Sequence, residues 1–337
     1  MRKLIMLLTL LLPVSLFLAG CGDGNADQAE ENTKNQLNVY TTVYPLQYFA
    51  ERIGGSYVDA QTIYPPGADE HTFEPSQKDM MALADSDLFI YIGLGLEGFV
   101  SKAEGTLENE NVTLLAAGEN IDMAGTEDGH AHEEGTEAEG HEDDGHSHED
   151  DGHSHEDDGH NHGDVDPHVW LDPLYAADLA EAIKDELAEK MPERQKEFEE
   201  NFQKLAAELD SLHHEFKETI DSAKHKEIIV SHAAYGYWEK RYGLEQISVS
   251  GLSTSNEPTQ KELENIIKTA REHGLNYIFF EQNVSSKLTE IVQNEVGAKS
   301  LQLHNLSVLT DENIDNKETY FTLMENNLKG IEKALNN

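Results

Sequence analysis

The chain has 337 residues, of which 24 are Lys or Arg and 66 are Asp or Glu, so its formal net charge is −42 with 17 His counted as neutral. A field of this sign repels nucleic-acid phosphates, because binding to them depends on Lys and Arg, and it excludes a nucleic-acid partner. The length suggests about two domains, and 38% hydrophobic residues suffice for globular cores. With Cys21 as its single cysteine, the chain forms no intramolecular disulfide or cysteine-based zinc finger, so nitrogen and oxygen atoms hold any metal.

The first residues are typical of an export signal. Two basic residues precede a largely apolar stretch over 4–19, which ends in Leu-Ala-Gly-Cys21. A transmembrane anchor is the alternative, but the stretch contains Pro13 and lies near the short end of the ~17–25 residues that span a bilayer. The ending resembles the bacterial lipobox, which implies that residues 1–20 are removed and that Cys21 is lipidated and anchors the chain to the membrane. The polar residues 21–36 then form a flexible tether.

Apolar and β-branched runs alternate with helical patterns from residue 37 onward. They predict strands over 37–42, 58–64, 88–92 and 112–117, and helices over 47–53, 77–85 and 97–104. Ser76 and Asp79 have the spacing of a capping box at the start of the second helix. Strands separated by helices predict a parallel sheet in an α/β lobe, to which we assign residues 37–190.

A low-complexity insert over residues 126–164 interrupts this lobe. The sequence Gly145-His-Ser-His-Glu-Asp-Asp151 is repeated once and then decays, and the repeat contains no apolar residue. Nine histidines lie among carboxylates and glycines, at His130, His132, His141, His146, His148, His153, His155, His160 and His162. This composition predicts a disordered, metal-attracting segment, which we call the histidine tract. A merely solubilising acidic loop is the alternative, but it would need no imidazoles.

A zinc-protease motif in the tract is disfavoured by spacing. Such a motif needs two histidines four residues apart on one helical face, whereas His141 and His146 are five apart. Residues rich in Gly and Asp also form helices poorly.

Two helices follow the tract. Asp172 and Pro173 form an N-cap and first helical position, and this helix extends to about Lys190. Pro192 begins a longer helix with apolar residues at alternating steps of four and three, namely Phe198, Phe202, Leu205, Leu209, Leu212 and Phe216. A coiled-coil dimer would need about three to four heptads, and this apolar stripe is shorter than that. We therefore expect a monomer in which residues 191–221 form a connector helix along both lobes.

The alternation of strands and helices resumes after the connector. Strands are predicted over 228–231, 247–250, 277–281 and 300–303, and helices over 235–241, 287–296 and 317–335, with another after Pro258 and Thr259. Glu262 completes a capping box with Thr259. Residues 222–337 thus form a second α/β lobe.

Four residues with metal-binding side chains stand at or just beyond the carboxyl ends of predicted strands: His71, His168, His232 and Glu281. Ligands of open α/β sheets bind outside these strand ends. Two of the four residues belong to each lobe, so one ion between the lobes could contact all of them. A single histidine of this kind is more often structural, and the joint pattern favours a metal site.

Three imidazoles and one carboxylate suit Zn²⁺, whereas carboxylate-rich sites suit Mn²⁺, Mg²⁺ or Ca²⁺. Four protein ligands leave no position for an activated water, so we expect a metal-binding protein that is not an enzyme. Glu70, Asp166 and Asp172 are candidate hydrogen-bond partners for imidazole N–H groups, although Asp172 has the alternative role of an N-cap.

The motifs around these residues resemble those of the zinc-specific solute-binding proteins of metal-uptake ABC transporters. They are Pro66-Gly-x-x-x-His71, Asp166-Pro-His-Val-Trp-Leu-Asp-Pro173, Ser231-His-Ala-Ala-Tyr-Gly-Tyr237 and Phe279-Phe-Glu281, and the resemblance covers nearly all of 37–337. It implies two lobes bridged by one rigid helix, with His71, His168, His232 and Glu281 as ligands in the cleft. The manganese-binding branch has a carboxylate where His232 stands, so His232 favours zinc. Some zinc members carry a disulfide in the second lobe, which this chain cannot form.

The resemblance also implies a function. The chain would be a lipoprotein on the outer face of a bacterial cell membrane that captures Zn²⁺ and delivers it to the permease of an ABC transporter, with the histidine tract as an auxiliary, low-affinity collector. An extracellular zinc hydrolase would need an open coordination position and a positioned base, and the sequence indicates neither. A surface adhesin or passive metal buffer would not require the four ligands at strand ends.

Overall fold

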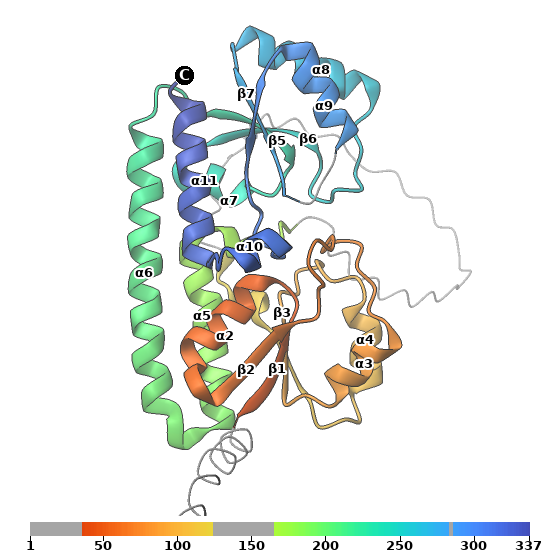
Figure 1. The fold of residues 1–337 in the computed structure, drawn as a ribbon, viewed down its shortest axis with the longest axis vertical. Helices are drawn as coiled ribbons and strands as arrows, with labels where there is room; N and C mark the ends of the chain where they lie inside the picture. The colour runs from red at the N-terminus through yellow and green to blue at the C-terminus, as the bar shows by residue number, and fades with distance from the viewer. Residues whose placement is uncertain (1–35, 124–164, 283–285) are drawn as a thin grey trace, which may run out of the picture.

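The computed structural model describes residues 36–123, 165–282 and 286–337, which form two α/β lobes stacked along the long axis (Figure 1). The first sheet has the order β2-β1-β3-β4 and the second the order β6-β5-β7-β8, and all neighbouring strands are parallel. The strands are β1 (Leu37–Thr41), β2 (Val58–Thr62), β3 (Leu88–Tyr91), β4 (Thr113–Ala116), β5 (Glu227–His232), β6 (Glu245–Ser250), β7 (Tyr277–Phe280) and β8 (Lys299–Gln302). The predicted fold class is confirmed.

Helices cover both sheets and one long side of the molecule. The α-helices are α2 (Tyr44–Gly54), α3 (Gln77–Ala84), α4 (Val100–Leu107), α5 (Pro173–Lys190), α6 (Gln195–Asp221), α7 (Gly236–Tyr242), α8 (Gln260–Glu272), α9 (Lys287–Val296), α10 (Asp311–Asp315) and α11 (Tyr320–Leu335). Short 3-10 turns are η1 (Gly55–Tyr57), η2 (Ala117–Asn120), η4 (Val169–Leu171) and η5 (Pro192–Arg194). Among the described residues, no helix combines the length and hydrophobicity that crossing a bilayer requires.

The local signals for helix starts are confirmed. Ser76 and Asp79 form the predicted capping box of α3, and Thr259 and Glu262 form that of α8, each exchanging side-chain and backbone hydrogen bonds. Such boxes satisfy N–H groups that have no partner within the helix.

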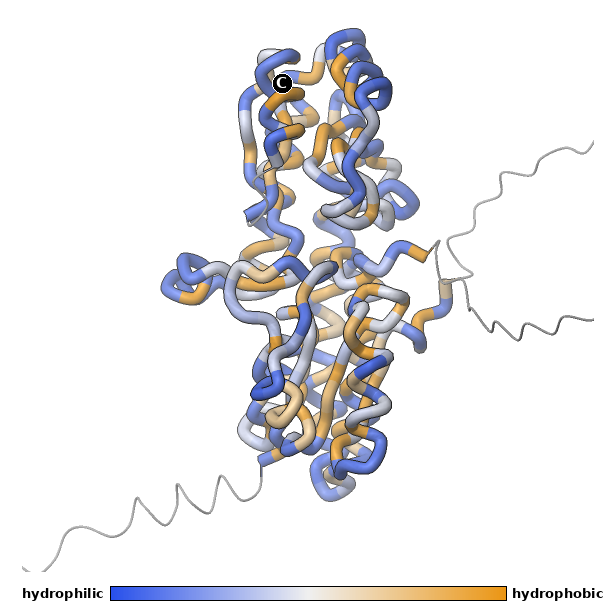
Figure 2. Tube along the Cα trace, turned by 90° about the vertical axis from the view of Figure 1, so that its right-hand side faces the viewer, coloured by the Kyte–Doolittle hydropathy of each residue, from blue (hydrophilic) through white to orange (hydrophobic). Residues whose placement is uncertain are grey.

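The apolar stripe of α6 is buried as predicted from Phe198 to Phe216, and Ile220 extends it by one turn. This helix lies beside α5 and α11 along the side of both lobes (Figure 1). Figure 2 shows hydrophobic residues within the lobes and hydrophilic residues on the outer helical surfaces. The division into 37–190, 191–221 and 222–337 stays a prediction.

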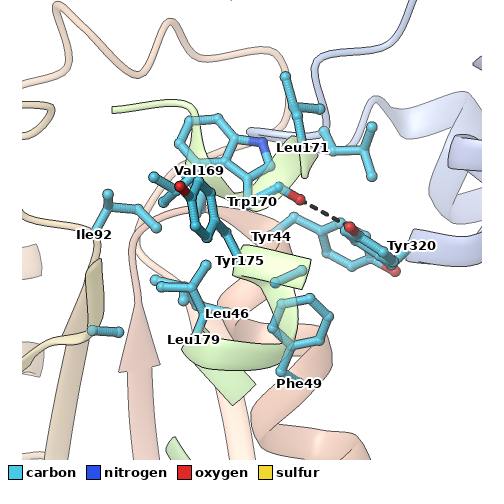
Figure 3. Close-up of a cluster of buried hydrophobic side chains, with 14 of the residues drawn as sticks. Tyr44, Leu46, Phe49, Ile92, Val169, Trp170, Leu171, Tyr175, Leu179 and Tyr320 are labelled. Atoms are coloured by element: carbon cyan, nitrogen blue, oxygen red, sulfur yellow. Dashed lines mark hydrogen bonds between the residues drawn. The ribbon is translucent and has the colours of Figure 1, made fainter. Parts of the chain in front are cut away.

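The carboxyl-terminal segment supplies a second connection between the lobes, which the sequence did not predict. Tyr320 at the start of α11 is fully buried, and its ring lies 5.1 Å from that of Phe49 in α2. Its hydroxyl donates to the carbonyl oxygen of Trp170 at 2.9 Å (Figure 3). The second lobe is therefore fixed to the first by α11 as well as by α6.

Candidate metal centre

The three predicted histidines meet at the junction of the lobes. His232 is the last residue of β5, His168 precedes η4, and His71 lies in the loop after β2. Their ring centroids are 5.3 Å apart for His71 and His168, 5.9 Å for His71 and His232, and 5.2 Å for His168 and His232. His168 and His232 are buried and His71 is partly buried. Residues 64 or more apart in sequence thus form one imidazole cluster.

The apolar sequence after His168 holds that residue in place. Val169, Trp170 and Leu171 are buried in the core (Figure 3). The Trp170 indole also donates from Nε1 to the carbonyl oxygen of Asn305 at 2.7 Å, and its ring lies 5.3 Å from the His168 ring. Core packing therefore limits the movement of the His168 backbone.

The free imidazole nitrogens have the spacing of metal ligands. His168 Nε2 and His232 Nε2 are 3.3 Å apart. Two nitrogens that each lie ~2.0–2.1 Å from one Zn²⁺ at a tetrahedral angle are about 3.3 Å apart. His71 Nε2 is buried and has no hydrogen-bond partner among the described residues. A buried polar atom of this kind requires an explanation, which a bound cation provides.

Two carboxylates contact the Nδ1 atoms of His168 and His232, on the side of each ring away from Nε2. Asp166 Oδ1 lies 2.8 Å from His168 Nδ1, and Glu281 Oε1 contacts His232 Nδ1. A carboxylate in this position favours the proton on Nδ1 and leaves the Nε2 lone pair free for a metal. Asp166 therefore has the position expected of a residue that supports a ligand.

The carboxylate beside the three imidazoles is Glu70. One ligand atom from each of Glu70, His71, His168 and His232 lies within 4.8 Å of all the others. Glu281 lies on the other side of the His232 ring, where its Oε1 contacts Nδ1. The sequence assigned the two carboxylates the opposite roles, with Glu281 as ligand and Glu70 as a supporting residue. Direct ligation by Glu281 stays a prediction, and the geometry favours Glu70.

Asn305 joins these two carboxylates, and the sequence does not predict this residue. Its Nδ2 donates to Glu70 Oε1 and to Glu281 Oε2, both at 3.0 Å. Its Oδ1 accepts from Gln282 Nε2 at 2.8 Å and from Ser307 Oγ at 2.9 Å, so the amide orientation is fixed by its partners. No sequence motif distinguishes this loop asparagine from the others in the chain.

Asp172 forms no hydrogen bond with an imidazole of the described residues, so the structure contradicts the expectation that it supports one of the three clustered histidines. It caps α5, where Oδ1 accepts from the backbone N–H of Leu174 at 2.9 Å and of Tyr175 at 3.1 Å. Its other oxygen pairs with Arg241. The alternative role as an N-cap accounts for this residue.

Burial changes the protonation of the cluster. It lowers the pKa of His71 to about 4, helped by the neighbouring His168 and His232 rings. Burial also lowers the pKa of His168, against the effect of Asp166. It raises the pKa of Glu70 to about 7. For His232, burial lowers the pKa, but the Glu281 carboxylate outweighs this and the net direction is upward. The His71 imidazole therefore stays neutral well below neutral pH. A cation bound beside Glu70 would favour the ionised form of the Glu70 carboxylate.

Residues 39–334 match the family described as zinc-uptake complex component A, periplasmic. The chain belongs to this family. The match confirms the resemblance that the motifs indicated, and a component of an uptake complex agrees with binding rather than catalysis.

Relatives support this membership at the level of sequence and fold. The chain is 33% identical over 336 residues to the zinc-binding lipoprotein AdcA of Streptococcus pneumoniae (strain ATCC BAA-255 / R6), covering 99% of this chain and 61% of that protein. It is 32% identical over 320 residues to the high-affinity zinc uptake system protein ZnuA of Bacillus subtilis (strain 168), covering 95% and 94%. The crystal structure of the Zn(II)-bound ZnuA-like domain of Streptococcus pneumoniae AdcA has a TM-score of 0.69 and 29% identity, covering 90% of this chain and 100% of that one. The chain thus spans about six tenths of the length of the AdcA relative.

Proposed function

We propose that this chain binds one Zn²⁺ tightly between its two lobes and serves as an extracytoplasmic solute-binding protein for zinc uptake. The observation that carries the proposal is the cluster of three imidazoles, in which two Nδ1 atoms are held by carboxylates and the Nε2 atoms of His168 and His232 are 3.3 Å apart. Affinity of nitrogen-rich sites for Zn²⁺ exceeds that for Mn²⁺. The metal is the cargo of the protein.

The proposed ligands are His71, His168 and His232 together with one carboxylate. Glu70 is supported by its position beside the three rings, and Glu281 by the family resemblance. A carboxylate as fourth ligand completes tetrahedral coordination and leaves no open position for catalysis.

Delivery of the metal to the permease of an ABC transporter is the second part of the proposal. It is supported by the family description and by the names of the relatives from Streptococcus pneumoniae and Bacillus subtilis. We propose that the chain acts as a monomer on the outer face of the cell membrane, anchored through lipidated Cys21. Cys21 and the export signal lie outside the described residues.

The histidine tract, which also lies outside the described residues, is proposed to collect zinc at low affinity. Its nine histidines and many carboxylates have side chains that can bind metal, and a composition of this kind supports many weak sites. Tight binding is therefore assigned to the cluster between the lobes.

Deleting residues 126–164 tests this assignment. We expect equilibrium competition with a chromophoric chelator to find one tight Zn²⁺ per chain before and after the deletion, with additional weak binding only in the intact protein. Lowering the pH from 7.5 to 5.5 should release the weakly bound metal, since unperturbed imidazole protonates near a pKa of ~6.5. The tight site should retain zinc at pH 5.5, because burial lowers the pKa of His71 to about 4 and also lowers that of His168. The Glu281 carboxylate raises the pKa of His232, but a cation bound at Nε2 opposes protonation of that ring. Loss of the tight, acid-resistant binding upon deletion would place the site in the tract.

A further inference from the structure

The loop that carries His71 is hydrogen-bonded to the second lobe through both residues that precede His71. Asp69 Oδ2 accepts from Thr254 Oγ1 at 2.6 Å, and Glu70 Oε1 accepts from Asn305 Nδ2 at 3.0 Å. Thr254 lies in the loop between β6 and α8, and Asn305 lies in the loop after β8. Two consecutive residues of the first lobe are thus held by side chains of the second.

Asp69 connects Thr254 to His71. While Asp69 Oδ2 accepts from Thr254, its other oxygen, Oδ1, accepts from the backbone N–H of His71 at 2.9 Å. Hydrogen bonds to an ionised acceptor are stronger than those between neutral groups. A single side chain therefore couples the backbone position of a candidate ligand to a hydroxyl of the opposite lobe.

The hydroxyls on either side of Thr254 make no such contact with the described part of the first lobe. The hydroxyls of Ser253 and Ser255 bond to each other at 2.8 Å. The loop is closed by backbone hydrogen bonds from Gly251 to Asn256 at 3.1 Å and from Asn256 to Ser253 at 3.0 Å. Among these three adjacent hydroxyls, that of Thr254 alone bonds to a described residue of the first lobe. Ser255 therefore provides a matched control for the loss of a hydroxyl in the same loop.

We propose that Thr254 is a positioning residue for zinc retention, which acts through Asp69 to hold His71 against the other lobe and so slows metal release. This inference rests on the proposed function. Movement of the loop that carries His71 away from the second lobe breaks the hydrogen bond between Thr254 and Asp69. The effect should therefore be seen in the dissociation rate of zinc, more than in its association rate.

The test is stopped-flow release of Zn²⁺ from the full chain, loaded with one equivalent of metal and mixed with excess chromophoric chelator. Thr254→Val keeps the shape of the side chain and removes the donor, and we expect it to accelerate the slow release phase roughly fivefold to tenfold. Thr254→Ser restores the hydroxyl and should stay within about twofold of the unchanged protein, and Ser255→Ala should have no effect.

A double-mutant cycle assigns the effect to the pair. Once Asp69→Ala has removed the acceptor, Thr254→Val should not accelerate release further, because interacting residues are non-additive. Release at the unchanged rate in Thr254→Val, equal acceleration in Ser255→Ala, or full additivity with Asp69→Ala would each overturn the inference. Absence of any slow phase in the unchanged protein would overturn the proposed function itself, and this inference with it.

Discussion

Replacing His71, His168 or His232 with Ala, one at a time, lowers the affinity for Zn²⁺ by at least about tenfold, because residues that merely support ligands already contribute that much. Each substitution removes one nitrogen donor from the cluster and leaves two imidazoles where the site has three. Competition with a chelator of known affinity measures the loss. An unchanged affinity in any of the three variants would remove that residue from the site.

His213 and His214 on α6 provide the controls for these substitutions. His213 Nδ1 lies 3.1 Å from the Tyr242 hydroxyl, and the His214 side chain is 69% exposed. Neither belongs to the group of side chains positioned to share an ion. Replacing either with Ala should leave zinc affinity unchanged, so a loss in these variants would show that the assay reports general damage to the fold.

Substitution of the two buried glutamates by Gln should distinguish the ligand from the supporting residue. If Glu70 is the fourth ligand, Glu70→Gln replaces a metal-binding carboxylate by a neutral amide, and the affinity should fall by more than about 100-fold. Glu281→Gln keeps an oxygen that can accept a hydrogen bond from His232 Nδ1, so its loss should stay near tenfold. The measurement is the same competition assay at pH 7.5.

The reverse order of effects would establish Glu281 as the ligand. In that case the metal would draw Glu281 away from His232 Nδ1, and Glu70 would stay hydrogen-bonded to Asn305 without binding the metal. Equal losses would contradict the distinction between the two carboxylates that the geometry makes.

The features predicted correctly from sequence are those that depend on local chemistry. The capping boxes at Ser76 and Thr259 involve residues three positions apart, and the stripe on α6 reflects helical periodicity. The expectation that His168 and His232 lie near each other rested on topology, since residues at the carboxyl ends of parallel strands gather at one edge of the sheet. The structure places His232 at the end of β5 and His168 before η4, and their role as ligands stays a prediction. Both kinds of signal can be read without knowing how the lobes pack.

Other features depend on packing between distant segments. Glu70 and His71 are neighbours in one loop, and nothing in the sequence indicates which of two glutamates points toward the histidines. Asn305 and Thr254 gain their roles only when the second lobe meets the first. The short helix α10 also escaped prediction, because five residues give little periodicity.

The helix after β3 starts later than predicted. The helix predicted over 97–104 extends instead over Val100–Leu107, and it follows a turn in which Gly93, Leu94 and Gly95 all have positive φ. The buried carboxylate of Glu97 holds this turn by accepting from the backbone N–H groups of Ile92 at 2.9 Å and Gly93 at 3.0 Å. Glu97 therefore stabilises a loop where a helical residue was expected.

Anomalous scattering at the zinc absorption edge, from crystals of the chain loaded with one equivalent of Zn²⁺, tests the central claim most directly. We expect a single strong peak at the junction of the lobes, within ~2.0–2.1 Å of the Nε2 atoms of His71, His168 and His232. A strongest peak outside this cluster, or none within bonding distance of all three imidazoles, would contradict it.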